Sequence, residues 1–147
     1  MSDPEILCLR HEHRLQWEPL WREYLRFYEV SLADQVTDQA WSRLTHGRRM
    51  HALGAFRDSG QLVGFVHYLF HPSTWSLADS CYLEDLFVAA EARRCGVGRR
   101  LIQAVYEAAD AEGAPRVYWI TSETNYAGRA LYDKVATKSH FVQYRRR

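Results

Sequence analysis

Apolar and polar residues follow two different periods along this chain of 147 residues. Large apolar side chains recur every three or four residues from His13 to Tyr28, which is the spacing of one face of an amphipathic helix. The same spacing predicts further helices over 37–44, 100–110 and 125–135. Short apolar runs of strand length occupy 5–10, 50–56, 62–70, 81–88, 116–121 and 140–145.

The order of these elements, βααβββαβαβ, predicts an α+β protein. Ser59 and Gly60 separate two apolar runs and indicate a hairpin turn, so part of the sheet is antiparallel. We find no repeat, low-complexity segment or linker, and therefore expect one domain over 1–147. The predicted fold is a mixed, mostly antiparallel sheet flanked by about four helices.

Composition and charge argue against several classes of binding partner. Formal net charge is +1, so no overall field favours nucleic acid or an anionic membrane, and we expect neither as a partner. Cys8, Cys81 and Cys95 form no CxxC motif, which is typical of free thiols in the cytoplasm. His11 and His13 have no third ligand at a supporting spacing, so we expect no metal.

The segment "ARRCGVGRRL" at 92–101 carries the strongest chemical signal. It joins a predicted strand to a predicted helix, and a helix N-terminus presents unpaired N–H groups that attract phosphate oxygens. Gly96 and Gly98 allow close approach of an anion, or simply a tight turn. A P-loop needs GK[ST], but Arg99 follows the second glycine, and a dinucleotide fingerprint needs a third glycine where Leu101 stands.

The pattern that remains is RxxGxG, and on it the chain resembles the GCN5-related N-acetyltransferases (GNAT). "YLEDLFV" followed by "RRCGVG" is similar to the diamine and thialysine acetyltransferases. "VYWITSETNYAGRALYDKVA" is similar to the fungal group of histone and D-amino-acid acetyltransferases. The resemblance implies the GNAT fold and acetyl-CoA as the donor cosubstrate. It also implies a binding set of Leu86, Phe87, Val88, Arg93, Arg94, Cys95, Gly96, Val97, Gly98, Arg99 and Asn125.

Two proton transfers accompany acetyl transfer to an amine. A lysine-like amine with a pKa near 10.4 is neutral in about one molecule in 2,500 at pH 7, so a base is needed. Glu84 and Asp85 are adjacent in a strand and are expected to point to opposite faces unless a bulge intervenes. The resemblance at "YLED" favours Glu84 as the base and leaves Asp85 in reserve. Tyr132, matched by the family's "LY" pair, is the predicted proton donor to the departing thiolate.

We therefore expect an N-acetyltransferase that acts on a primary amine of a small molecule, such as a polyamine or amino acid, by direct attack in a ternary complex. Three alternatives stay open: a protein lysine as acceptor, a non-catalytic module that binds coenzyme A, and a nucleotide-binding module. The last segment, "VATKSHFVQYRRR", lacks the "GF" turn found in many family members. Its strand pairing is open to completion by a second subunit, and a homodimer is expected.

Overall fold

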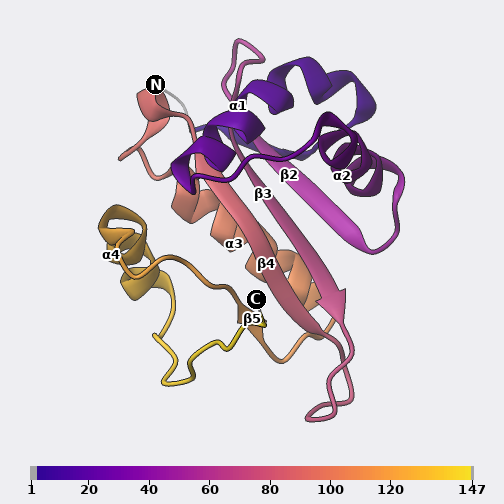
Figure 1. The fold of residues 1–147 in the computed structure, drawn as a ribbon, viewed down its shortest axis with the longest axis vertical. Helices are drawn as coiled ribbons and strands as arrows, with labels where there is room; N and C mark the ends of the chain where they lie inside the picture. Colours follow the sequence, from indigo (N-terminus) through magenta and orange to yellow (C-terminus); the bar gives the residue numbers. More distant parts are fainter. Residues whose placement is uncertain (1–2, 147) are drawn as a thin grey trace.

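A five-stranded sheet runs through the computed structural model, which describes residues 3–146 (Figure 1). Its order is β1-β2-β3-β4-β5, with the first four strands antiparallel and β5 parallel to β4. The strands are β1 (Glu5–Cys8), β2 (Met50–Phe56), β3 (Leu62–His71), β4 (Ser80–Val88) and β5 (Val117–Tyr118). The helices are α1 (Arg14–Phe27), α2 (Asp34–His46), α3 (Val97–Ala111) and α4 (Tyr126–Val135), with short 3-10 turns at His11–His13 and Ala90–Ala92. The predicted α+β class with a mixed sheet is confirmed.

Helices cover both faces of the sheet, and each face has its own apolar core. In Figure 1, α1 and α2 lie on one face, α3 lies on the other, and α4 lies beyond the β4 edge. Trp17 and Trp41 pack with Phe65 on the first face. Leu101 and Ile102 of α3 are fully buried on the second. Two cores therefore hold the sheet from opposite sides.

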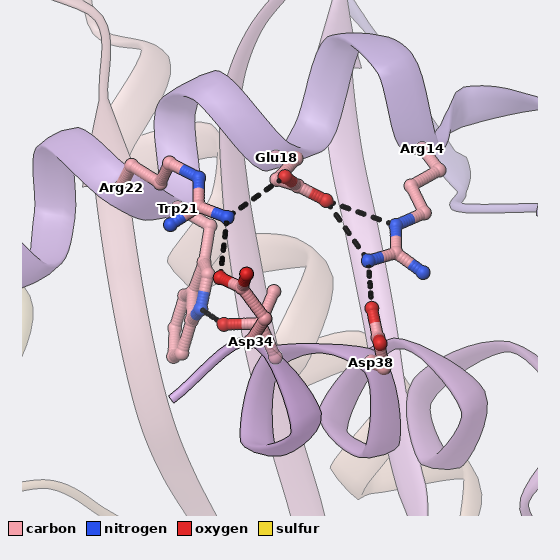
Figure 2. Close-up of polar contacts among 7 residues, drawn as sticks. Arg14, Glu18, Trp21, Arg22, Asp34 and Asp38 are labelled. Atoms are coloured by element: carbon pink, nitrogen blue, oxygen red, sulfur yellow. Dashed lines mark hydrogen bonds and ion pairs between the residues drawn. The ribbon is translucent and has the colours of Figure 1, made fainter. Parts of the chain in front are cut away.

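Ion pairs fix α1 against α2 (Figure 2). Glu18 of α1 accepts from Arg14 and from Arg22, each at 3.0 Å. Arg14 also contacts Asp38 of α2, and Arg22 lies 3.3 Å from Asp34. The two arginines hold the pKa of the Glu18 carboxyl below its usual range. This network, with the Trp21–Thr37 hydrogen bond of 3.3 Å, orients α1, which carries Trp17 and Tyr24.

The chain after α3 departs from the sequence prediction. The strand expected over 116–121 pairs for two residues only, at Val117 and Tyr118. The strand expected over 140–145 is wrong, because the described chain after Ala136 contains no strand. Its apolar side chains lack a surface to pack on, since Phe141 is 70% exposed and Tyr144 is 92% exposed. An alternating pattern without burial does not make a strand.

Candidate active site

A β-bulge in β4 creates the centre of the site. His67 of β3 pairs with Asp85, but the next residue, Tyr68, pairs with Leu83, so Glu84 has no partner across the ladder. Leu83 and Leu86 both belong to the α3-side core, which places the two carboxylates between them on the α1 side. The expectation that Glu84 and Asp85 point to opposite faces is therefore wrong, for the reason that a bulge adds one residue to the strand.

Asp85 is engaged by two donors from different elements. The Tyr24 hydroxyl of α1 donates to Asp85 Oδ1 at 2.7 Å. The His67 ring of β3 lies with Nδ1 2.9 Å from Asp85 Oδ2. Both oxygens of this largely buried carboxylate are thus satisfied, as buried charges require. Asp85 is held in place and is a poor choice for a base that must reach a substrate.

A third hydrogen bond decides the protonation of His67. Trp17 Nε1 lies 3.1 Å from His67 Nε2, and an indole N–H can only donate. Nε2 is therefore the acceptor, and the ring proton sits on Nδ1, where it faces Asp85. In this arrangement His67 is neutral and donates to a carboxylate that remains negative.

Glu84 is the free carboxyl of the pair. Its residue is exposed, whereas Asp85 is only partly so. Partial burial and the nearby Asp85 charge raise the pKa of Glu84 above its usual value. A carboxylate with a raised pKa and solvent access fits a general base.

The outer edge of β4 is open beyond the bulge. Pairing with β5 covers Cys81 and Tyr82 only, while on the other side Ala89 N–H donates to Val63 O at 2.8 Å. Alternation along an antiparallel ladder then directs the N–H groups of Leu86 and Val88 away from β3. Strand divergence at this point leaves main-chain donors for a ligand that lies along β4.

The backbone N–H of Phe87 is not free to donate to a ligand. Phe87 faces Phe65 in the hydrogen-bonded register of β3, and its ring is in the α1-side core. The N–H of Phe87 is therefore directed toward β3, while those of Leu86 and Val88 are directed to the open side, and the cofactor contacts expected at these three residues stay predictions. Val88 O accepts from Arg93 Nε at 3.0 Å, and the Arg93 guanidinium lies over the Phe87 ring.

The glycine-rich turn opens α3 as predicted. Gly96 is the residue before the helix and has φ 80°, a left-handed conformation in which glycine is favoured. Arg94 has φ 63° in the same turn. Successive N–H groups in a turn with left-handed residues form an anion-binding concavity, and the α3 N-terminus adds its dipole. Cys95, Val97 and Arg99 complete the turn, and the Cys95 thiol lies 3.4 Å from Arg93 O.

Gly98 serves a packing role in addition. A Cβ at this position would lie 3.1 Å from Leu131 Cδ2 of α4 and 3.7 Å from Val88 Cγ2. The missing side chain lets α4 approach the start of α3. The near contact is with the end of a flexible side chain, so packing favours a small residue here without requiring glycine.

Helix α4 carries the other two predicted residues. Asn125 precedes the helix, where Oδ1 accepts from Gly128 N at 3.2 Å and Nδ2 donates to Thr121 at 3.0 Å. Tyr132 packs against Trp119, and burial with the neighbouring Tyr28 raises the pKa of its phenol to about 12. The hydroxyl of Tyr132 is therefore protonated at neutral pH and available to donate.

A pocket of about 380 Å³ lies between the end of α1 and the loop before α4. Its lining is Phe27, Tyr28, Glu29, Ser122, Thr124 and Asn125. The Tyr28 and Thr121 hydroxyls, 3.2 Å apart, join its two sides.

Comparison with known proteins decides the family. The sequence profile of the Acetyltransferase (GNAT) family matches residues 10–136. The chain belongs to the GNAT family. As a GNAT protein it is an acyltransferase enzyme, which confirms the resemblance drawn from the RxxGxG turn and its neighbours.

Two curated relatives of this GNAT chain are named for amine substrates. D-amino-acid N-acetyltransferase HPA3 of Saccharomyces cerevisiae is 38% identical over 132 residues, covering 88% of this chain and 82% of that protein. Thialysine N-epsilon-acetyltransferase of Caenorhabditis elegans is 25% identical over 135 residues, covering 92% and 83%.

A solved aminoglycoside N-acetyltransferase in complex with coenzyme A has the same fold, with a TM-score of 0.85 at 18% identity. The match covers 100% of this chain and 97% of that one. Within residues 3–146 of the GNAT chain, no helix has the length and apolar character needed to cross a membrane.

Sequence reasoning missed Tyr24, His67 and Trp17 as members of the site. A signal for His67 was present, because a histidine inside the apolar run 62–70 must find a polar partner when the strand is buried. Which partner it finds depends on the strand register, and that was not readable from the sequence.

Proposed function

We propose that this GNAT enzyme transfers the acetyl group of acetyl-CoA to a primary amine of a small molecule by direct attack in a ternary complex. The observation that carries the proposal is the bulge at Glu84, which presents one free carboxylate beside an engaged one at the open edge of β4. Amino acids are the first acceptors to consider, because the relatives are named for D-amino acids and thialysine.

The chain's own groups fit coenzyme A at the β4 edge and the α3 turn. N–H groups of Leu86 and Val88 face the side that β5 has left, and the turn at Arg94 and Gly96 presents an anion-binding concavity. Arg93, Arg94 and Arg99 add positive charge for a diphosphate. Asn125 is engaged as the α4 cap and holds the start of that helix in place. Bound acetyl-CoA supplies the acetyl group as a thioester.

Glu84 is the proposed base. At pH 7 a lysine-like amine is almost entirely protonated, and forming its neutral, nucleophilic state costs about 4.6 kcal/mol. A carboxylate that accepts the proton recovers part of this cost. Glu84 first takes one proton from the ammonium, directly or through water, which frees the nitrogen lone pair for attack. As the N–C bond forms and the C–S bond breaks, the nitrogen gives a second proton to water and becomes the amide. The N–H groups near Leu86 and Val88 are placed to donate to the carbonyl oxygen as it gains charge.

Tyr132 is the proposed donor to the sulfur. Its pKa of about 12 keeps the phenol protonated. An ordinary thiol has a pKa near 8.5, so complete transfer of the phenol proton would be uphill by roughly 5 kcal/mol. Tyr132 therefore acts by donating a hydrogen bond to the developing thiolate, which leaves as the thiol after taking a proton from water.

An amine panel with a thiol-release readout tests this function. The panel holds D- and L-amino acids, thialysine, polyamines, an aminoglycoside and a lysine-containing peptide. The proposal expects thiol release that depends on one or more of the small amines, and a loss of about tenfold or more in Tyr132→Phe. Asp110→Asn, an exposed change on α3, is the matched control and retains the rate. Release with the peptide alone would favour a protein substrate, and binding of acetyl-CoA without transfer to any amine would contradict the proposal.

Homodimer formation and a cytoplasmic setting are part of the same proposal. β5 is two residues long, and Phe141, Val142 and Tyr144 are exposed on the segment that follows α4. A second copy would cover such apolar side chains. Cys8, Cys81 and Cys95 are free thiols, as in proteins of reducing compartments. Light scattering that gives the mass of one chain at all concentrations would contradict the dimer.

A further inference from the structure

The carboxylate beside the proposed base is held by a connected set of hydrogen bonds. Tyr24 of α1 and His67 of β3 each donate to one oxygen of Asp85, at 2.7 and 2.9 Å. Trp17, which is fully buried, donates to the far nitrogen of His67 at 3.1 Å. We call these four residues the Asp85 clamp. It joins α1, β3 and β4 at the bulge.

The clamp fixes charge as well as position. If His67 were protonated at both nitrogens, it would neutralise Asp85 and present a positive ring toward Glu84. The Trp17 N–H points at His67 Nε2, the atom that a second ring proton would have to bind. The histidine therefore stays neutral. Asp85 consequently keeps one uncompensated negative charge next to the bulged residue.

We propose that Asp85 is a positioning residue of the active site: the clamp holds its negative charge beside Glu84, and this fixed charge makes Glu84 a stronger proton acceptor. The inference rests on the proposed function, in which Glu84 receives the proton of the amine. It assigns a role to Tyr24, His67 and Trp17, none of which touches the reacting atoms.

The groups that act on Glu84 come from three elements. Asp85 and Tyr82 are neighbours on β4, His67 faces it from β3, and Tyr24 acts from α1 through Asp85. Asp85 and partial burial raise the pKa of Glu84, while His67 would lower it if charged. Burial and the Asp85 carboxylate raise the pKa of Tyr24 also, so Tyr24 remains a donor throughout the working pH range. Together these effects raise the pKa of Glu84, and the charge of Asp85 contributes to that rise.

Asp85→Asn separates charge from structure. The asparagine Oδ1 can accept from His67 Nδ1, and its Nδ2 can donate to the Tyr24 oxygen, so the bulge keeps its hydrogen bonds while the charge is lost. Trp17→Phe is a second, independent change. It frees His67 Nε2 to take a proton, and a charged His67 then neutralises Asp85. Both variants are expected to lower the pKa of the Glu84 carboxyl.

The test is a direct titration of the Glu84 carboxyl by carbon NMR in the folded protein, with its signal assigned by loss in Glu84→Gln. We expect the midpoint to move to lower pH in Asp85→Asn and in Trp17→Phe, and to stay in place in Asp110→Asn. The acid limb of kcat/KM against pH is expected to move with the midpoint. A Glu84 midpoint unchanged in either folded variant would overturn the inference, because a merely structural Asp85 leaves that midpoint where it is.

The same experiment distinguishes failure of the inference from failure of the proposed function. The NMR midpoint reports the Asp85–Glu84 coupling whether or not the enzyme turns over. A shifted midpoint supports the coupling even if Glu84→Gln keeps full transferase activity, in which case Glu84 is not the base and the proposed mechanism fails alone. Circular dichroism checks that each variant is folded before its titration is interpreted.

Discussion

The bond between Tyr24 and Asp85 allows a quantitative test of how the site is held. Tyr24→Phe removes one hydroxyl and keeps the ring, which packs on Trp21, Phe65 and Phe87 at centroid distances of 5.5, 5.9 and 6.1 Å. A hydrogen bond to a charged group contributes about 1.5–3 kcal/mol. Asp85 keeps its bond to His67, so we expect a loss near the middle of that range, roughly 2 kcal/mol.

For 147 residues an unfolding entropy of about 2.1 cal/mol/K per residue converts this loss to a Tm lower by roughly 6 °C. Urea unfolding and calorimetry of wild type and Tyr24→Phe measure both quantities. Tyr28→Phe is the matched control, because the Tyr28 hydroxyl meets the neutral Thr121 at 3.2 Å and its loss is expected to stay below about 1 kcal/mol.

The sign of the pH dependence follows from the raised pKa of Tyr24. The folded pKa lies above the ordinary value of about 10, so the contribution of Tyr24 is complete below pH 10 and declines as pH rises further. The stability difference between wild type and Tyr24→Phe should therefore be constant near neutrality and shrink above about pH 10. A Tyr24→Phe protein as stable as Tyr28→Phe at neutral pH would refute the reasoning.

Two other predictions concern the glycine turn and the α1–α2 ion pairs. Gly96→Ala places alanine at φ 80° and should cost about 1 kcal/mol, whereas Gly98→Ala meets only the flexible end of Leu131 and gains helix propensity, so its stability should be close to wild type. Weaker coenzyme A binding by calorimetry in a stable Gly98→Ala protein would show that the turn contacts the cofactor; unchanged binding would contradict it. Glu18→Gln should cost up to about 1 kcal/mol at neutral pH. The pKa of Glu18 is lowered, so this difference should be lost as pH falls below about 4.3, and a difference that persists in acid by urea unfolding would contradict the ion-pair account.

Periodicity and turn chemistry predicted most of the fold. The apolar run 50–56 became β2 without a change of boundary, and the hairpin turn formed at Gly60 with φ 88°. Helix α2 is longer than the predicted 37–44, because the one apolar residue of its first turn from Asp34, Val36, is 46% exposed and does not continue the apolar face of the helix. The run 140–145 failed since local pattern says nothing about whether a neighbouring strand is present.

Some residues of the site were predictable from the sequence, but their arrangement was not. Glu84, Tyr132 and the glycine turn were found from sequence, and their assigned roles stay predictions. The bulge was not found, since it depends on the register between β3 and β4, and a shift of one residue changes which side chains share a face. The clamp of Asp85 by Tyr24 and His67 joins residues 61 and 18 positions apart, which no local pattern brings together.

The central claim is that Glu84, presented by the bulge, takes the proton of the amine during acetyl transfer. Its most direct test is kcat/KM against pH for wild type and Glu84→Gln, with acetyl-CoA and the best amine of the panel. The account predicts that Glu84→Gln lowers kcat/KM by about a hundredfold or more near neutrality and removes the acid limb of the profile. A Glu84→Gln enzyme that keeps the wild-type rate and the same acid limb would contradict it.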